Sequence, residues 1–340
     1  MKVLVTGCNG YIGTVMVPIL VAAGHDVTGL DTNYYASGWL YGQPLSLKQF
    51  IKKDIRNVSA EDVAGFDAII HLGELSNDPL GQNDPELTFE INHKGTVKLI
   101  DACIAAGVPR FIYSSSCSVY GASDEVSDEV SLTNPLTAYA KSKVLNEQYL
   151  LSKASDAFCP VIFRNATVYG PSPRMRFDLA VNNLAGLAWT TGEVKMDSDG
   201  TPWRPFIHIL DVCEAFRLAL TAPKVKVSGQ IMNVGDTRSN YQIKEIAEII
   251  GKVFGVSNIT LNKQGADKRN YRVNFDKIKN VLGFSCSRDV KRGAEELKEI
   301  FESVALSRDT FLSKEYTRLK MIDYLKSSGK LDESLLWITL

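Results

Sequence analysis

Short apolar runs alternate with longer amphipathic stretches over the first half of the chain. The apolar runs occupy residues 3–5, 25–30, 50–55, 66–73, 110–116 and 160–164, and their composition predicts buried strands. The stretches 86–106 and 139–153 predict helices. Regular alternation of strand and helix predicts an α/β fold with a doubly wound parallel sheet and right-handed crossovers. Ligands bind such sheets at the carboxyl ends of the strands.

The pattern changes after Gly170-Pro171. Residues 171–176 form a basic loop broken by prolines, 197–205 are rich in glycine, proline and aspartate, and helices are expected again at 211–221 and 242–253. We therefore divide the chain into a sheet domain, a smaller lobe and a helical C-terminal extension: residues 1–170 with returning segments near 206–236, residues 171–205 and 237–300, and residues 301–340.

Composition and charge exclude several classes of protein. The 340 residues include 38 basic and 39 acidic ones without a long like-charge run, so neither a nucleic-acid partner nor a membrane surface is expected. Six cysteines without a CxxC pair, and only four histidines, indicate no metal site and no disulfide framework. The N-terminus does not resemble a signal peptide, and no run approaches the ~18 apolar residues of a membrane span. A cytoplasmic protein is expected.

The first predicted strand runs into a loop with glycines at positions 7, 10 and 13. Glycines at this spacing allow a tight turn, close approach of the backbone to a phosphate, and close packing of helix on strand. Asp31 ends the second strand, 18 residues after Gly13. A carboxylate there accepts hydrogen bonds from both hydroxyls of an adenosine ribose and repels a 2′-phosphate. The spacing therefore predicts NAD rather than NADP.

A second constellation carries acid–base chemistry. Tyr139 and Lys143 are four residues apart and share one face of the predicted helix. The ammonium, together with a cationic nicotinamide ring, favours the phenolate, which is the base that oxidation of a hydroxyl needs. The strand 110–116 ends in three serines, 23 residues upstream of Tyr139, and a serine there can bond the same substrate oxygen.

With these motifs in order, the sequence resembles the extended short-chain dehydrogenase/reductase family, specifically its nucleotide-sugar epimerases and dehydratases, over about residues 1–300. The resemblance implies a Rossmann-type NAD-binding sheet domain, a smaller C-terminal substrate-binding lobe and a nucleoside-diphosphate sugar as substrate. It also implies a homodimer formed through the helices around 88–106 and 139–153. The motifs that carry it are Gly7-x-x-Gly10-x-x-Gly13, Asp31, Asp54-Ile55, His71-Leu72-Gly73, Asn92, Ser114-Ser115-Ser116-x-x-Val119-Tyr120-Gly121, Tyr139-x-x-x-Lys143 and Arg164-x-x-x-Val168-Tyr169-Gly170-Pro171.

The resemblance also implies a role for individual residues. Ser116, Tyr139 and Lys143 would be catalytic, with Tyr139 as acid/base and Lys143 also on the nicotinamide ribose. The cofactor residues would be Gly7, Gly10, Tyr11, Ile12 and Gly13 at the diphosphate, Asp31 and Asn33 at the ribose, Asp54 and Ile55 at the adenine, and Leu72, Gly73 and Asn92 along the path, with Tyr139 and Lys143 at its end. The substrate residues would be Ser118, Asn165, Arg176, Asn183, Leu184, Arg204, Asp267 and Arg269.

Departures from the family pattern limit the choice of reaction. Cys117 and Ser118 stand where 4,6-dehydratases carry an Asp-Glu pair, so dehydration lacks its acid and base and is disfavoured. Cys117 is a weak acid/base or, as we favour, a small packed residue. Ser76 stands where galactose-type epimerases often carry lysine, which leaves the sugar open. Arg174 and Arg176 are either diphosphate ligands or solvated charges, and the sequence does not decide between these roles. We expect His71 and His208 to be structural.

The sequence thus predicts an NAD-dependent nucleotide-sugar epimerase that acts by hydride transfer at carbon 4 of the hexose. The alternative is a carbon-4 dehydrogenase or 4-ketoreductase with exchangeable NAD(H), which uses the same residues. A 4,6-dehydratase and a non-catalytic NAD-binding regulator are less favoured, because Ser116, Tyr139 and Lys143 are all present. The base, the sugar and the role of residues 301–340 stay open.

Overall fold

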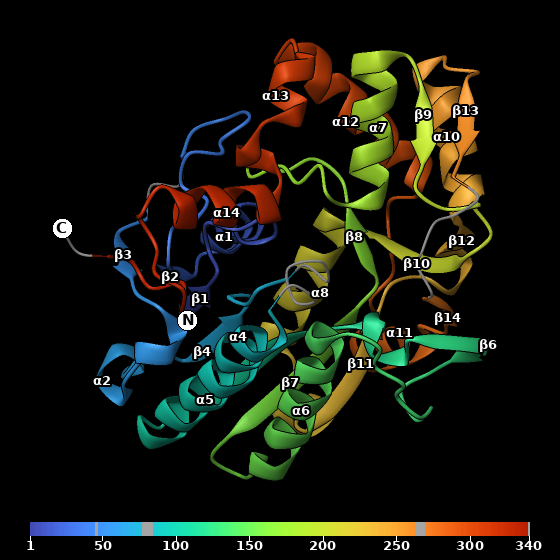
Figure 1. Ribbon diagram of the computed structural model, residues 1–340. Coiled ribbons are helices and arrows are strands. Elements are labelled where there is room, and N and C mark those ends of the chain that lie inside the picture. The colour runs from blue at the N-terminus through green and yellow to red at the C-terminus, as the bar shows by residue number, and fades with distance from the viewer. Residues whose placement is uncertain (45–46, 77–83, 263–268, 339–340) are drawn as a thin grey trace.

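The computed structural model describes residues 1–44, 47–76, 84–262 and 269–338. A seven-stranded, all-parallel sheet forms its centre (Figure 1), and this confirms the predicted doubly wound α/β fold. The strands, in their order across the sheet, are β11 (Gln230–Val234), β7 (Cys159–Asn165), β5 (Arg110–Ser116), β4 (Ala68–His71), β1 (Lys2–Thr6), β2 (Asp26–Asp31) and β3 (Gln49–Lys52).

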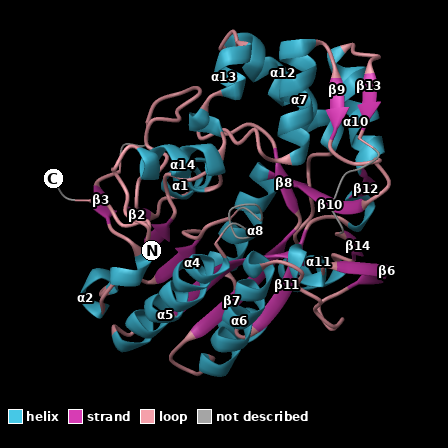
Figure 2. Ribbon diagram, in the orientation of Figure 1, coloured by secondary structure: helices cyan, strands magenta, loops and turns pink. Residues whose placement is uncertain are grey.

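Helices cover both faces of this sheet, as the apolar character of its strands requires. Val3 and Val5 of β1 face one layer, while Leu4 between them faces the other. The first layer contains α1 (Gly13–Ala22), α8 (Ile209–Thr221), α9 (Lys224–Val227) and α11 (Asp276–Leu282). The second contains α2 (Ala60–Val63), α5 (Thr96–Ala105) and α6 (Ala138–Lys153), with α4 (Pro85–Phe89) beside it (Figure 2).

A smaller lobe lies beyond the carboxyl ends of the strands and has its own apolar core (Figure 1). Its α10 (Ile243–Phe254) begins at a capping box between Gln242 and Glu245 and ends at Gly255, whose φ of 70° suits glycine. Its other helices are α7 (Ala180–Thr191), α12 (Val290–Ser303) and α13 (Arg308–Leu312). Small sheets accompany these helices in the described part of the chain. One consists of β8 (Thr167–Tyr169), β10 (Trp203–His208) and β12 (Asn240–Gln242). Two others pair β9 (Val194–Met196) with β13 (Ile259–Leu261), and β6 (Ala122–Ser127) with β14 (Asn270–Val273).

The C-terminal residues 314–338, which we call the strap, cross back from the smaller lobe to the sheet (Figure 1). The strap contains a short turn, η5 (Lys314–Tyr316), then α14 (Arg318–Ser327), then an irregular tail closed by a bridge between Leu331 and Trp337. Met321, Ile322 and Leu325 of α14 pack against Tyr34, which follows β2. The sequence predicted helices here, and α14 is the main one.

Local chemistry explains where the elements differ from the sequence-based boundaries. The strand expected over 50–55 ends at Lys52, because Asp54 caps the turn η1 (Ile55–Asn57). The helix expected over 86–106 contains a wide turn of π type, η2 (Glu90–Gly95), between α4 and α5. Two further short turns are η3 (Cys117–Tyr120) and η4 (Thr237–Ser239).

Within the part of the chain that the structure describes, no helix is long and apolar enough to cross a membrane. The division into 1–170 with 206–236, 171–205 with 237–300, and 301–340 stays an interpretation of the sequence.

Candidate functional site

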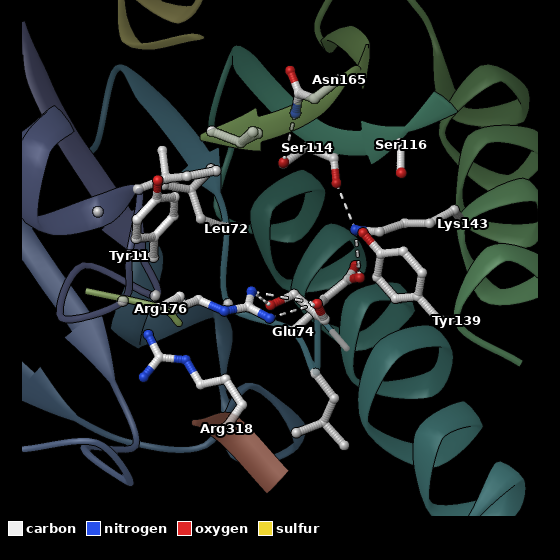
Figure 3. Close-up of a pocket in the computed structure, with 18 of the residues that line it drawn as sticks. Tyr11, Leu72, Glu74, Ser114, Ser116, Tyr139, Lys143, Asn165, Arg176 and Arg318 are labelled. Carbon is white, nitrogen blue, oxygen red and sulfur yellow. Dashed lines mark hydrogen bonds and ion pairs between the residues drawn. The ribbon is translucent and has the colours of Figure 1, made fainter. Parts of the chain in front are cut away.

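A cleft of about 290 Å³ opens at the carboxyl ends of the central strands (Figure 3). This is the edge at which doubly wound sheets bind their ligands. Most of the residues predicted for the site line this cleft: Gly7, Gly10, Tyr11, Ile12, Gly13, Asp31, Asp54, Ile55, Leu72, Gly73, Ser116, Ser118, Tyr139, Lys143, Asn165, Arg176 and Arg269.

The glycine loop between β1 and α1 is shaped by close backbone contacts. Gly7 has a φ of 70°, which favours glycine. A Cβ on Gly13 would lie 2.3 Å from the carbonyl oxygen of Gly7, so only glycine lets the helix start this close to the strand. The backbone amides at the start of α1 then face the cleft, where they can hold a diphosphate.

Asp31, at the end of β2, is held in a fixed orientation at the same rim. Its Oδ2 accepts a hydrogen bond from the Asn9 amide at 3.0 Å, and its Oδ1 accepts one from the Asn33 amide at 2.7 Å. Burial raises the pKa of this carboxyl, and the two amides oppose the rise. A carboxylate positioned in this way suits the hydroxyls of an adenosine ribose. The glycine loop and Asp31 together therefore fit NAD.

The catalytic candidates lie at the other end of the cleft. The Thr137 side chain caps α6, which carries Tyr139 and Lys143 on one face. The Lys143 ammonium lies 5.3 Å from the centre of the Tyr139 ring and donates to the Ser114 carbonyl at 2.5 Å. Ser116 lines the same part of the cleft as Tyr139 and Lys143 (Figure 3).

Glu74 is a functional candidate that the sequence reasoning missed. Its carboxylate is buried in the cleft wall, with Oε2 at 2.6 Å from the Lys143 ammonium. Its Oε1 accepts hydrogen bonds from the Tyr113 hydroxyl at 2.8 Å and from Thr96 at 3.1 Å. Burial lowers the pKa of Lys143, but Glu74 and the nearby Tyr139 more than offset this, so the pKa is raised overall. An acidic residue three positions after the buried strand β4 was the available signal.

His71, beneath Glu74, has the structural role that the sequence suggested. Its ring lies between the hydroxyls of Thr6, at 2.6 Å, and Thr96, at 2.8 Å. Burial lowers its pKa to about 4, so the ring is neutral near pH 7. His208, which caps α8, is similar: burial lowers its pKa to about 4.

The Cys117 thiol is packed rather than placed for acid–base work. It is buried in the core of the sheet domain and donates to the Arg164 carbonyl at 3.1 Å. Burial raises its pKa well above the ordinary value.

Arg176, one of the two arginines of the basic loop, is buried rather than solvated. Its guanidinium is buried at the cleft and forms a two-pronged ion pair with Asp178, at 2.8 and 3.0 Å. It also donates to the Ser76 hydroxyl at 3.0 Å. Ser76 therefore lies next to a cation that comes from a distant segment of the chain.

The other expected site residues do not line the cleft within the described residues. Asn33 bonds Asn9 at 2.6 Å, and Asn92 clamps both backbone groups of Leu75 at 2.8 and 2.9 Å. Asn183 bonds the Phe177 carbonyl, Leu184 is in the core of the smaller lobe, and Arg204 lies 5.3 Å from the ring centre of Tyr271. Tyr271 itself lines the cleft, so Arg204 is one residue removed. Asp267 lies outside the described residues.

A dinucleotide cradle and a Tyr–Lys pair at one sheet edge define the class of NAD-binding oxidoreductases. Residues 3–235 match the NAD dependent epimerase/dehydratase family. The chain is 28% identical over 304 residues to the UDP-glucose 4-epimerase of Corynebacterium glutamicum, covering 84% of this chain and 91% of that protein. It is 30% identical over 267 residues to the dTDP-D-glucose 4,6-dehydratase of Mus musculus, covering 73% of each. A solved structure of UDP-glucuronic acid 4-epimerase from Bacillus cereus, in complex with UDP-glucuronic acid and NAD, has a TM-score of 0.76 at 26% identity and covers 89% of this chain and 100% of that one.

The chain belongs to the NAD-dependent epimerase/dehydratase family. The predicted family, the Rossmann-type fold, the NAD cofactor and the class of extended short-chain dehydrogenase/reductase enzymes are thereby confirmed. Epimerases and dehydratases are similar to this chain to a like degree, so the comparisons support a nucleotide-sugar epimerase or dehydratase.

Proposed function

We propose that the chain is a nucleotide-sugar 4-epimerase acting at carbon 4 of the hexose. The observation that carries the proposal is the meeting of Ser116, Tyr139 and Lys143 at one end of a cleft whose other end fits NAD. The substrate is a nucleoside-diphosphate sugar, held between this end of the cleft and the smaller lobe. Asn165 and Arg269, on the cleft wall, are its proposed contacts, and Arg204 acts from behind Tyr271.

The residues of this chain would work as follows. NAD, when bound, supplies an acceptor for the hydride of carbon 4 and can return that hydride. The Lys143 ammonium would stabilise Tyr139 as a phenolate, and this phenolate would take the proton of the 4-hydroxyl. Ser116 hydrogen-bonds the same oxygen. When carbon 4 is reduced on its opposite face, Tyr139 would return the proton to the same oxygen and the centre would be inverted.

The carboxylates of the cleft argue against dehydration. Those that line it within the described residues are Asp31, Asp54 and Glu74. Asp31 is held at the ribose end, and Asp54 is ion-paired with Arg56 at 2.7 Å. Glu74 is engaged by Lys143 at 2.6 Å. An elimination needs an acid and a base at neighbouring carbons, and Cys117 and Ser118 do not provide them.

Proton NMR with a panel of nucleotide sugars, first without and then with added NAD, tests the proposal. A new epimer that forms without accumulation of NADH is the expected result. Stoichiometric NADH with a 4-keto product would contradict it and establish the alternative, a carbon-4 dehydrogenase. Loss of water from the sugar would identify a 4,6-dehydratase instead.

The proposal includes a homodimer formed through α5 and α6. Leu145 lies in the middle of the exposed stripe of α6 and is 38% exposed in the single chain. Large apolar side chains in such positions favour burial against a second copy. Light scattering should give twice the mass of the chain, and Leu145→Lys should shift the mass toward the monomer. A monomeric wild type would contradict the dimer.

A further inference from the structure

The strap lies over the ribose end of the cofactor cleft and is attached there by apolar packing. Met321, Ile322 and Leu325 of α14 form one buried cluster with Tyr34 and Leu75. Tyr34 and Leu75 also line the cleft. The strap therefore packs directly against the cleft wall.

Hydrogen bonds hold the tail of the strap to the same rim. The Trp337 indole donates to the carbonyl of Thr32, the residue after Asp31, at 2.6 Å. The Tyr34 hydroxyl donates to the Leu335 carbonyl, and Arg56 donates to the Ser334 carbonyl at 2.9 Å. These contacts fix the position of α14 relative to the end of β2.

Arg318, the first residue of α14, brings a cation into the cleft. Its side chain is 95% buried, with 5% of the residue exposed, and it lines the cleft. The guanidinium lies 3.8 Å from the ring centre of Tyr35 and extends toward Arg176 (Figure 3). Within the described residues, this contact with the Tyr35 ring is accompanied by no side-chain hydrogen bond and by no ion pair with a carboxylate.

Two other buried arginines, Arg164 and Arg176, do not share this situation. Arg164 contacts Glu147 at 2.6 Å, and Arg176 contacts Asp178 at 2.8 Å. Burial of a guanidinium is unfavourable unless an anion compensates the charge, which these carboxylates do. Arg318 is buried to the same degree without such a partner.

The electrostatics around Arg318 point to an anionic ligand. Burial, together with the neighbouring cations Arg176 and Arg174, lowers its pKa to about 10, while Tyr35 and Asp178 oppose this fall. The group is therefore still charged near pH 7. Asp178 is paired with Arg176 through both of its carboxylate oxygens.

We propose that Arg318 binds the diphosphate of NAD, and that the strap is a cofactor-retaining element of this chain. A guanidinium presents its donors in a fork that matches phosphate oxygens, and the glycine loop supplies further donors in the same cleft. The inference rests on the cofactor half of the proposed function.

Both NAD and a nucleoside-diphosphate sugar carry a diphosphate, and we assign Arg318 to that of NAD. Burial raises the pKa of Asp31, and Arg318 is close enough for its positive charge to oppose this rise. The strap is also bonded to Thr32, at the same end of the cleft. Arg269 and Arg204, the proposed contacts of the sugar nucleotide, come from the smaller lobe instead.

Isothermal titration calorimetry of the full-length chain, freed of bound nucleotide, distinguishes the diphosphate of NAD from that of a nucleoside-diphosphate sugar as the ligand of Arg318. The ligands are ADP-ribose, which has the cofactor's diphosphate, adenosine, which has none, and UDP, which has that of a sugar nucleotide. The variants are Arg318→Gln, Arg318→Lys and the matched control Lys320→Gln, an exposed cation on the same helix that donates to the Leu312 carbonyl.

R318Q should weaken binding of ADP-ribose by roughly ten- to hundredfold and leave adenosine and UDP unchanged. R318K, which keeps the charge but not the fork, should lose severalfold, and K320Q should match the wild type. Unchanged affinity of R318Q for ADP-ribose would overturn the proposal. Weakened binding of UDP alone would also overturn it and assign Arg318 to the sugar nucleotide.

If R318Q does not melt cooperatively, R318K decides, since an affinity for ADP-ribose equal to that of the wild type would contradict the two-pronged contact. The readout is binding, so it is independent of turnover. A chain whose ADP-ribose affinity depends on Arg318, but which converts no nucleotide sugar, would remove the proposed epimerase and leave this inference standing.

Discussion

The two walls of the cleft are built in different ways. The sheet wall consists of strand ends and the starts of α1 and α6, and its members lie within a few residues of a regular element. The strap wall brings Arg318 against Tyr35, 283 positions earlier in the chain. The candidate catalytic residues are therefore encoded locally in the sequence, whereas the covering of the cleft by the strap depends on the tertiary fold.

The largest effect is expected from Tyr139→Phe, which tests whether the chemistry belongs to the sheet wall. Loss of the proton-transferring hydroxyl should reduce turnover by about 10²- to 10⁴-fold. Affinity for ADP-ribose should not change, because the strap and the glycine loop are intact. The control is Tyr149→Phe on the same helix, whose hydroxyl bonds Asp101 away from the cleft. Full activity of Y139F would overturn the catalytic assignment.

Gly13→Ala tests the cradle of the sheet wall. The new Cβ would lie 2.3 Å from the Gly7 carbonyl oxygen, a backbone atom, so the loop must move. We expect at least a roughly tenfold loss of affinity for NAD, together with a lower melting temperature. Val21→Ala, at an exposed position of α1, is the matched control. An NAD affinity equal to the wild type would mean that the amides of this loop do not hold the diphosphate.

Glu74→Gln tests whether a residue of the sheet wall sets the pH dependence of turnover. The carboxylate now compensates the charge of Lys143, and its removal leaves the ammonium free to stabilise the Tyr139 phenolate. The other titratable groups around Glu74 are His71, neutral near pH 7, and Tyr113. The acidic limb of the pH profile of kcat should therefore move to lower pH, by about one unit.

The exposed Glu90, which pairs with Lys94, gives the control substitution Glu90→Gln. A profile of E74Q that is unchanged, or that moves to higher pH, would show that Glu74 does not act through Lys143.

Trp337→Phe is expected to have the smallest effect, and it addresses the strap wall alone. It removes the hydrogen bond to Thr32 while keeping an aromatic ring near Tyr34, whose ring centre lies 5.9 Å away. The docking of the strap should weaken by about 1 kcal/mol. Hydrogen exchange of α14 should become severalfold faster, whereas that of α6 should not change. Equal acceleration in both helices would mean that the strap and the sheet domain open as one unit.

The sheet and its ligand edge could be predicted because each strand is an apolar run followed by a turn signal. The cleft lining at Gly7, Asp31 and Tyr139 follows from spacing within one or two elements. Strands of three residues, such as β8 and β9, carry too little pattern to be recognised. Asn92 illustrates a third case, in which a polar residue near the site satisfies the backbone of Leu75 instead of facing the cleft.

Glu74 and Arg318 could not be predicted because their roles depend on partners from other elements. Glu74 follows β4, but it matters only because Lys143 of α6 ends 2.6 Å away. Arg318 occurs in a polar helix whose sequence is that of an ordinary surface element. Long-range contacts of this kind leave no periodic signal in the chain.

Trp337 also gives the protein an optical reporter. The chain has four tryptophans, at positions 39, 189, 203 and 337, and the indole of the last is bonded to Thr32 beside the cofactor cleft. Reduced nicotinamide absorbs light in the range in which tryptophan emits. A version of the chain that keeps Trp337 and replaces the other three by phenylalanine would therefore show binding of the reduced cofactor as quenched emission. Release of the strap would appear as a change in the emission wavelength, in real time and without a label.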